Sequence, residues 1–295
     1  MFQILKEVLN KRRLRSRSGI FCYNFHQVAA VFDPRIHMRG TFTSMRTFEK
    51  YIKYFKNNFD LLSVPAAAEL QSSKIFQGKY ACLTFDDGDA GIEHVIKFLV
   101  SEGVPASFFL NSAYIGTNSI DPFRVANYLM QDRSSTVCRD KLRQLTSTLR
   151  RTMSRSQFEK AKEELRNLGK GIPFGEMNSY IRREYLQSVD NPLVNFGLHG
   201  HEHDRFILLD YSEQMKSLSL NIEFVAQLKG YVPMFAIPFG RPWDWNGITI
   251  NACNDLGISF LFANGGVNTG DEIGLKRIPA DNRHLLLEMQ MGYFQ

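Results

Sequence analysis

The chain of 295 residues lacks the marks of a disulfide-bonded or membrane-spanning protein. Its four cysteines are scattered, without the paired spacing of a disulfide framework or a zinc cluster. No apolar run approaches the roughly eighteen residues that a membrane span needs, and the N-terminus lacks the apolar stretch and cleavage site of a secretion signal. We therefore expect a cytoplasmic protein with reduced thiols at Cys22, Cys82, Cys138 and Cys253.

The chain also lacks a proline-, glycine- or serine-rich linker that would divide it into domains. With 44% hydrophobic residues it can bury a sizeable core. Short apolar runs alternate with amphipathic stretches along most of its length, which indicates an α/β fold. A length near 300 could mean two domains, but the candidate site residues described below come from both halves, which favours one.

Two adjacent carboxylates end an apolar run in the first half of the chain. Residues 81–85 (Ala-Cys-Leu-Thr-Phe) favour a β-strand, and Asp86, Asp87 and a glycine follow directly. Neighbouring side chains at the end of a strand diverge. One carboxylate can therefore bind a cation while the other stays free as a base, which is the division that metal-assisted hydrolysis requires.

A second apolar run, residues 194–198, ends at His199, and His203 follows four positions later. On a helical turn this spacing would place both imidazoles on one side. Two histidines and one carboxylate form the ligand set of catalytic zinc, which leaves a fourth position for water. Zinc is the default divalent metal, although cobalt, nickel, manganese or iron would also suit. The alternative is an ordinary turn and a polar surface loop; His201 is expected to stay outside the ligand set.

At these residues the chain resembles the polysaccharide deacetylase family, whose catalytic module is called the NodB homology domain. The resemblance rests on Thr-Phe-Asp-Asp-Gly at residues 84–88 and His-x-x-x-His at residues 199–203. It implies that Asp86 is the general base, and that Asp87, His199 and His203 hold a divalent metal. The implied reaction is attack of an activated water on an N-linked or O-linked acyl group, which releases a carboxylate and an amine or alcohol.

The resemblance extends over about residues 20 to 280. Residues 22–28 are similar to the stretch that often opens these proteins, and residues 59–64 to the strand that follows. Residues 104–110 resemble the second barrel strand, with Asn111 after it as a candidate substrate contact, and residues 235–240 resemble the Pro-aromatic-Gly groove motif. The implied fold is a distorted (β/α) barrel with its site at the carboxyl ends of the strands. The backbone N–H of Phe239 is the implied oxyanion donor, with plain core packing as the alternative.

Two positions depart from the family pattern. Ala236 stands where many relatives carry an arginine that pairs with the base, and Arg241 is a candidate replacement, with a solvated loop arginine as the alternative. The late Leu-x-His motif, which supplies the general acid in many relatives, is matched only loosely, by His284. Residues 276–279 instead resemble the Arg-Ile-Pro end of a subgroup without that histidine. His26 and His201 are weaker candidates for the acid.

The only two tryptophans, Trp243 and Trp245, follow the groove motif. We expect them to form a wall that stacks on a sugar ring, with ordinary packing as the alternative.

Residues 118–190 fit a barrel poorly and predict an inserted helical subdomain. Two apolar faces recur at helical spacing, and residues 123–130 predict a further short helix. The faces would pack on each other or on the barrel, and a mobile lid is the alternative. The two faces are formed by Cys138, Leu142, Leu145 and Leu149, and by Phe158, Ala161, Leu165 and Leu168.

Positive charge concentrates in two segments of a chain whose net charge is +6. Residues 1–17 hold six basic and one acidic side chain, and residues 132–170 hold eleven and five. No zinc-finger, RNA-recognition or basic-zipper pattern accompanies them, so we expect no nucleic acid partner. The basic N-terminal segment, residues 1–18, could contact an anionic membrane or remain a solvated tail; residues 19–295 form the domain.

The predicted function is removal of an acyl group, acetyl by default, from a sugar or glycan precursor of a bacterial surface polysaccharide. A nucleotide-linked or lipid-linked sugar would suit a cytoplasmic enzyme. A sugar deformylase, a non-sugar amidase and an inactive sugar-binding relative remain the alternatives. The oligomeric state is not predicted.

Overall fold

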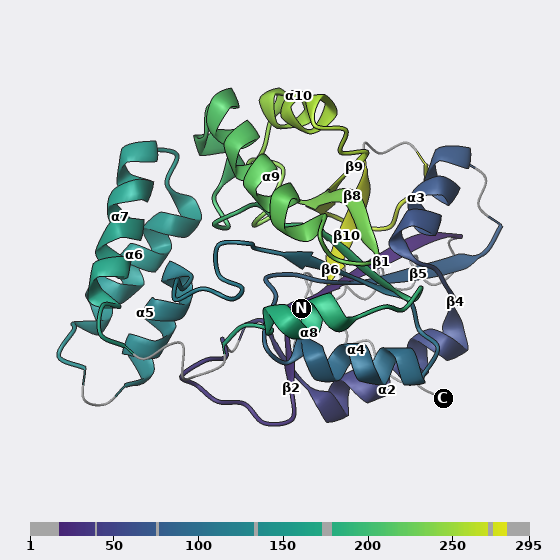
Figure 1. Cartoon of the computed structure of the whole chain (residues 1–295), viewed down its shortest axis with the longest axis horizontal. Coiled ribbons are helices and arrows are strands. Elements are labelled where there is room, and N and C mark those ends of the chain that lie inside the picture. The colour runs from purple at the N-terminus through teal and green to yellow at the C-terminus, as the bar shows by residue number, and fades with distance from the viewer. Residues whose placement is uncertain are drawn as a thin grey trace, which may run out of the picture.

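The computed structural model describes residues 18–38, 40–74, 77–132, 135–172, 179–270 and 274–281. Its centre is a sheet of eight strands in which every pairing is parallel. The spatial order is β1-β10-β9-β8-β7-β6-β5-β4, and β1 also pairs with β5. The sheet therefore curls until it closes through β1, and the predicted distorted barrel of an α/β protein is confirmed (Figure 1). The strands are β1 (Gly19–Phe25), β4 (Asp60–Leu61), β5 (Lys79–Phe85), β6 (Ala106–Leu110), β7 (Val194–Leu198), β8 (Tyr231–Ala236), β9 (Phe260–Asn264) and β10 (Leu275–Pro279).

Alternation along the strands separates two buried layers. On β1, Ile20 and Cys22 join a small cluster with residues of β5, β6, β8 and β10, whereas Phe21, Tyr23 and Phe25 join the larger cluster that extends under the helices. Successive side chains of a strand point to opposite faces, so one run of seven buried residues supplies both layers.

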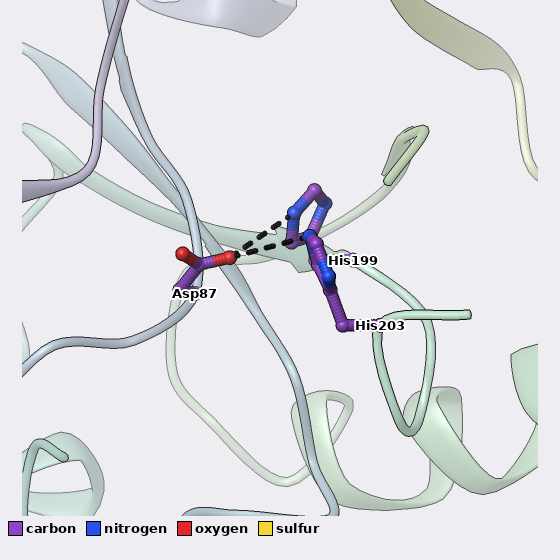
Figure 2. A group of neighbouring side chains, drawn as sticks. All are labelled: Asp87, His199 and His203. Carbon is purple, nitrogen blue, oxygen red and sulfur yellow. Dashed lines mark ion pairs between the residues drawn. The ribbon is translucent and has the colours of Figure 1, made fainter. Parts of the chain in front are cut away.

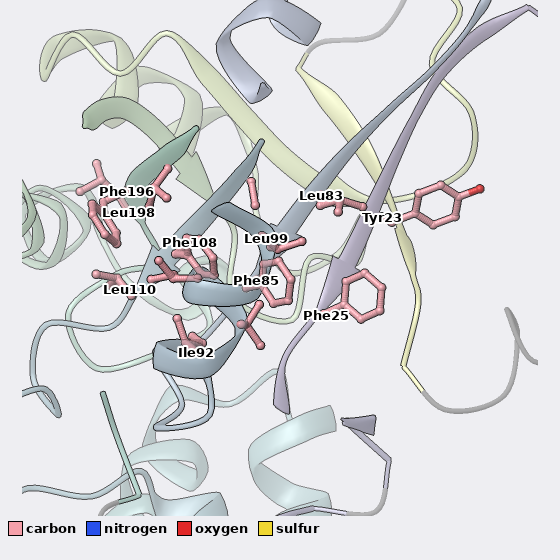
Figure 3. Close-up of a cluster of buried hydrophobic side chains, with 14 of the residues drawn as sticks. Tyr23, Phe25, Leu83, Phe85, Ile92, Leu99, Phe108, Leu110, Phe196 and Leu198 are labelled. Atoms are coloured by element: carbon pink, nitrogen blue, oxygen red, sulfur yellow. The ribbon is translucent and has the colours of Figure 1, made fainter. Parts of the chain in front are cut away.

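A row of phenylalanines crosses four neighbouring strands in the larger layer (Figure 3). Phe25, Phe85, Phe108 and Phe196 are register partners on β1, β5, β6 and β7. The ring centroids of Phe25 and Phe85 are 5.4 Å apart, and those of Phe85 and Phe108 are 4.9 Å apart. Such cross-strand contacts fix the register, and with it the level at which each strand ends.

Helices cover the outer face of the sheet. A serine caps the N-terminus of α2 (Met45–Asn58) and of α3 (Val64–Ser73), and a capping box begins α9 (Tyr211–Val225) and α10 (Gly247–Asp255).

The predicted strand at residues 59–64 is shorter than expected, because β4 has only two residues and α3 already begins at Val64. A separate two-stranded sheet joins β2 (Gln27–Ala29) and β3 (Phe42–Ser44). The covering helices are α2 (Met45–Asn58), α3 (Val64–Ser73), α4 (Ile92–Ser101), α8 (Arg183–Ser188), α9 (Tyr211–Val225) and α10 (Gly247–Asp255), with the short 3-10 helix η2 (Phe206–Leu208).

The segment between β6 and β7 carries three helices that stand beside the sheet, as Figure 1 shows: α5 (Pro122–Gln131), α6 (Arg139–Arg151) and α7 (Arg155–Leu168). The three helices share a separate hydrophobic cluster. All but one of the residues of the two predicted apolar faces belong to this cluster or pack against it. That residue is Cys138, which caps α6 and is exposed rather than buried. The face begins at Leu142 because the helix starts only after the cysteine.

Within the part of the chain that the structure describes, no helix is long and apolar enough to cross a membrane. The basic residues 1–17, for which the alternatives were membrane contact and a solvated tail, lie outside the described residues.

Candidate metal centre and catalytic pocket

A pocket opens where the parallel strands end. Asp86 and Asp87 follow β5, Asn111 follows β6, His199 follows β7, and Phe239 lies just beyond β8. Carboxyl ends of parallel strands meet at one edge of a barrel, which is why segments far apart in sequence deliver polar side chains to one place. The insertion closes one side, since residues of α5 and α6 also line the pocket.

Asp87, His199 and His203 converge in this pocket (Figure 2). Asp87 Oδ1 lies 3.4 Å from His199 Nε2 and 3.6 Å from His203 Nε2. One ligand atom from each residue falls within 4.8 Å of the others. The three residues predicted as metal ligands are therefore the group that the structure brings together.

Backbone bends, not a helix, produce this convergence. The segment from His199 to His203 is a loop, so the predicted helical turn is wrong. His203 has φ 56° and Asp87 has φ 71°, both in the left-handed region that side chains other than glycine seldom adopt. A strained backbone conformation persists only where the surrounding structure stabilises it. Here the conformation of Asp87 directs its carboxylate toward the two histidines.

The donor atoms fit a divalent cation. His199 Nδ1 lies 2.7 Å from the Ala236 carbonyl oxygen, so it donates a proton there and leaves the lone pair of Nε2 facing Asp87. Asp87 Oδ1 is buried and accepts no hydrogen bond from the described residues. A buried carboxylate oxygen without a partner is costly in a protein interior, and a cation bound by the three residues would remove that cost.

Asp86 is buried between Arg277 and Asn24. Arg277 Nη1 donates to Asp86 Oδ1 over 2.7 Å, and Asn24 Nδ2 donates to Oδ2 over 3.0 Å. Burial raises the pKa of Asp86, but the Arg277 charge outweighs it, together with His199 and His26, and the net shift is downward. Asp86 is thus held ionised beside the metal ligands.

Arg277 takes the role that we predicted for Arg241. The Arg241 guanidinium instead pairs with Asp244, with Nε 2.8 Å from Oδ2. The prediction that Arg241 approaches the base is therefore wrong. Arg277 reaches Asp86 because β10 pairs with β1, whose own neighbour on the other side is β5.

A histidine and aspartate pair lies on the other side of Asp86. His26 Nδ1 lies 2.6 Å from Asp281 Oδ2, and His26 Nε2 lies 3.9 Å from Asp86 Oδ2. Burial lowers the pKa of His26, but the negative charges of Asp281, Asp87 and Asp86 together raise it by more. The net result is a pKa of about 9. His26 therefore carries a proton that it can give up in the pocket. His284, the acid predicted first, lies outside the described residues.

The remaining predicted residues divide between pocket and surface. Phe239 lines the pocket with φ 62°, and its ring lies 4.9 Å from that of His203. Asn111 also lines it, and its amide donates to the carbonyls of His199 and Gly200, so it holds the ligand loop. The predicted tryptophan wall is wrong, because Trp243 is 56% exposed and Trp245 packs on the hydrophobic core. Neither is among the residues that line the pocket.

Sequence reasoning missed Arg277, Asn24 and Asp281 and undervalued His26. A signal was present for Asn24, which interrupts the apolar run of β1, whereas Arg277 directly follows Lys276 in β10 and is not an isolated polar residue. An isolated polar residue in a buried strand requires a partner. His26 and Asp281 gave no such signal, since each follows the end of a strand, where polar residues are common.

Comparisons with known proteins agree with this geometry. Residues 73–261 match the family model for polysaccharide deacetylase, whereas no curated protein matches in sequence. Among solved structures, IcaB from Ammonifex degensii has 17% identity and a TM-score of 0.52, with 90% of this chain and 94% of that chain covered. The Streptococcus pyogenes deacetylase PplD has 14% identity and a TM-score of 0.53, covering 89% and 93%. BC0361, a polysaccharide deacetylase from Bacillus cereus, has 12% identity and a TM-score of 0.57, covering 94% and 69%.

These structures share the fold of this chain over most of its length. The family match includes both aspartates and both histidines of the candidate metal centre. The chain belongs to the polysaccharide deacetylase family, and it is a carbohydrate deacetylase.

Proposed function

We propose that this protein is a divalent-metal-dependent hydrolase that removes an N-linked acetyl group from a sugar or a glycan precursor. The observation that carries the proposal is the placement of an ionised base, Asp86, beside the three candidate ligands Asp87, His199 and His203 in one pocket. A protonated histidine, His26, lies on the far side of that base. A base, an acid and a metal site together serve turnover rather than binding alone.

Asp87, His199 and His203 would hold the metal. A bound divalent cation lowers the pKa of water and polarises an acyl oxygen. Zinc suits this donor set, which combines two imidazoles with one carboxylate. The Ala236 carbonyl and the Asn111 amide orient His199 and its loop, and such supporting contacts commonly matter for metal affinity.

Asp86 is assigned as the general base. Its Oδ2 lies 3.8 Å from His199 Nε2, so the carboxylate faces the space in front of the ligands. It would accept a proton from the attacking water as the new carbon–oxygen bond forms. Arg277 keeps the carboxylate ionised and holds Oδ1, while Oδ2 accepts from Asn24 and has a second lone pair for the proton of the water.

His26 is assigned as the general acid. Asp281 holds its Nδ1, so Nε2 faces the pocket on the side of Asp86. When the tetrahedral intermediate collapses, the carbon–nitrogen bond breaks and the nitrogen takes a proton from His26 Nε2. The products are an amine and acetate. The His26–Asp281 pair orients the acid in the same way that a carboxylate orients the histidine of other hydrolytic sites.

The test is acetate and formate release by the purified protein from a panel of N-acetylated and N-formylated sugars, nucleotide-linked sugars and oligosaccharides. We expect acetate from at least one class, with the Asp86→Asn variant as the inactive control. Formate release alone would replace the deacetylase by a deformylase at the same site. Release that persists in Asp86→Asn would overturn the assignment of the base.

A further inference from the structure

Two arginines pack on two aromatic residues, Phe123 and Phe239, that line the pocket. Arg150, near the end of α6, has its guanidinium 5.3 Å from the centroid of Phe123. Arg241 has its guanidinium 5.8 Å from the centroid of Phe239. The two rings touch edge to face, with centroids 5.8 Å apart. The two rings thus carry both guanidiniums side by side.

The two arginines also bond directly, and their charges are not balanced. Arg241 Nη2 donates to the Arg150 carbonyl oxygen over 2.7 Å. Asp244 pairs with Arg241, but it also pairs with the buried Arg205, 3.0 Å away. The Arg241 and Arg205 guanidiniums therefore share the Asp244 carboxylate. With Arg150 the cluster holds three positive charges and one negative, and 3 − 1 leaves a charge of +2.

Arg150 itself forms no ion pair with any carboxylate of the described residues, although it lines the pocket. The nearby Asp121 does not neutralise it by contact, because its carboxylate accepts from the Phe123 N–H as the cap of α5 and faces His203 at 3.9 Å. Burial lowers the pKa of Arg150, and the charges of Arg241 and Arg151 lower it as well, whereas Asp121 acts in the opposite direction.

We propose that Arg150, with Arg241 beside it, forms a phosphate subsite, and that the substrate is a sugar that carries a phosphate ester. A guanidinium donates two parallel hydrogen bonds to a phosphate, and a phosphate ester with nearly two negative charges matches the charge of the cluster. The inference rests on the proposed function, because it names the substrate class of the same site. Arg150 packs on Phe123, Phe123 contacts Phe239, and Phe239 contacts His203. The acyl group and the phosphate therefore belong to one sugar or to neighbouring sugars.

The insertion and the barrel both contribute to the subsite. Arg150 and Phe123 belong to α6 and α5, whereas Phe239 and Arg241 follow β8. The insertion would therefore set specificity by adding an anion site to a barrel that supplies the hydrolytic chemistry.

The test measures binding, so that it does not depend on turnover. The zinc-loaded Asp86→Asn protein is titrated by calorimetry with N-acetylglucosamine, with its 1-phosphate and with inorganic pyrophosphate, which reports on the subsite whatever the sugar. Each titration is repeated after Arg150→Gln, after Arg150→Lys and after Arg151→Gln. Arg151 is the matched control, since it is the next residue of α6 and is exposed.

We expect Arg150→Gln to weaken binding of the phosphate-bearing probes roughly tenfold to a hundredfold, the usual range for a charged hydrogen bond. Arg150→Lys should keep part of that affinity, and Arg151→Gln nearly all of it. Equal binding of all probes by the Arg150→Gln and Arg151→Gln variants would rule out a soluble sugar phosphate as the ligand of the subsite. Lack of hydrolysis with any substrate, in contrast, would count against the proposed function and leave these titrations interpretable.

A second arm identifies the source of the phosphate. Flotation with phosphatidylcholine vesicles, with and without phosphatidylglycerol, is compared for the same variants. Loss of binding to the anionic vesicles in Arg150→Gln alone, with unchanged titrations, would assign the phosphate to a lipid headgroup. Loss in the titrations alone would assign it to a soluble sugar phosphate. If neither measurement separates Arg150→Gln from Arg151→Gln, the proposal is wrong.

Discussion

Arg277 Nη1 lies 2.7 Å from Asp86 Oδ1, although 191 positions separate the two residues in the sequence. Asn24 bridges them, because its Oδ1 accepts from Arg277 and its Nδ2 donates to Asp86. The arginine that the family resemblance placed near Ala236 is thus supplied by another strand of the same barrel. Ala236 serves through its backbone instead, since its carbonyl oxygen holds His199.

Asp86→Asn should reduce hydrolysis by about a hundredfold or more, which is typical for loss of a general base. An asparagine side chain has nearly the same shape but cannot take a proton from water. Because Asp86 is not one of the three converging ligands, bound metal should stay unchanged. Steady-state rates and metal content measured on the same preparation check this, and a fully active variant would refute the role of Asp86.

Arg277→Met should lower both activity and stability. The variant leaves the buried Asp86 charge without its cation, and breaking a buried ion pair typically costs about 3–5 kcal/mol of unfolding free energy. Arg277→Lys keeps the charge and should retain part of both. Denaturant unfolding and acetate release report the two effects, and a variant with native rate and native stability would contradict the pairing.

Asp281→Asn should move the alkaline limb of the pH–rate profile to lower pH. Asp281 raises the pKa of His26 to about 9, so the acid stays protonated at neutral pH and loses its proton as the pH rises through that value. Without Asp281, burial lowers the pKa of His26, and the protonated form is lost earlier. A bound divalent cation shifts both profiles downward by repulsion without changing their order. An unchanged alkaline limb would remove His26 as the acid.

Lys162→Met should weaken metal binding, although Lys162 is not a ligand. Its side chain is 5% exposed and joins α7 to the loop of His203 through Glu202, 2.7 Å away, and through Asp204. Loss of this buried cation should free the ligand loop and lower the melting temperature. Lys160→Met, on the exposed face of the same helix, is the matched control. Equal zinc affinity in the two variants would show that the contact does not position the loop.

The sequence predicted the parts of the molecule that local patterns encode. Apolar runs ending in polar pairs located β5 and β7, and the spacing of Leu142, Leu145 and Leu149 located one face of α6. The family motifs supplied the barrel and the three converging ligands, because those residues lie within two short segments.

Contacts between distant strands could not be predicted in this way. Arg277 and Asp86 meet only because β1 pairs with both β5 and β10, a closure that no local pattern reports. The prediction for the loop of His203 failed for a related reason. A spacing of four suggests a helix, whereas a loop with a left-handed backbone at Gly200 and His203 gives the same convergence. Trp243 and Trp245 follow the groove motif in sequence, but the chain turns away from the pocket before it reaches them.

Metal dependence is tested most directly by the metal content of protein purified without an affinity tag, measured together with hydrolysis after chelation and after return of zinc. We predict about one metal per chain, loss of hydrolysis on chelation and its recovery with zinc. His203→Ala should lose the metal, whereas His201→Ala should keep it, because the His201 ring bonds Ser112, which follows β6. Hydrolysis that survives chelation in a metal-free protein, or equal metal in the two variants, would contradict the account.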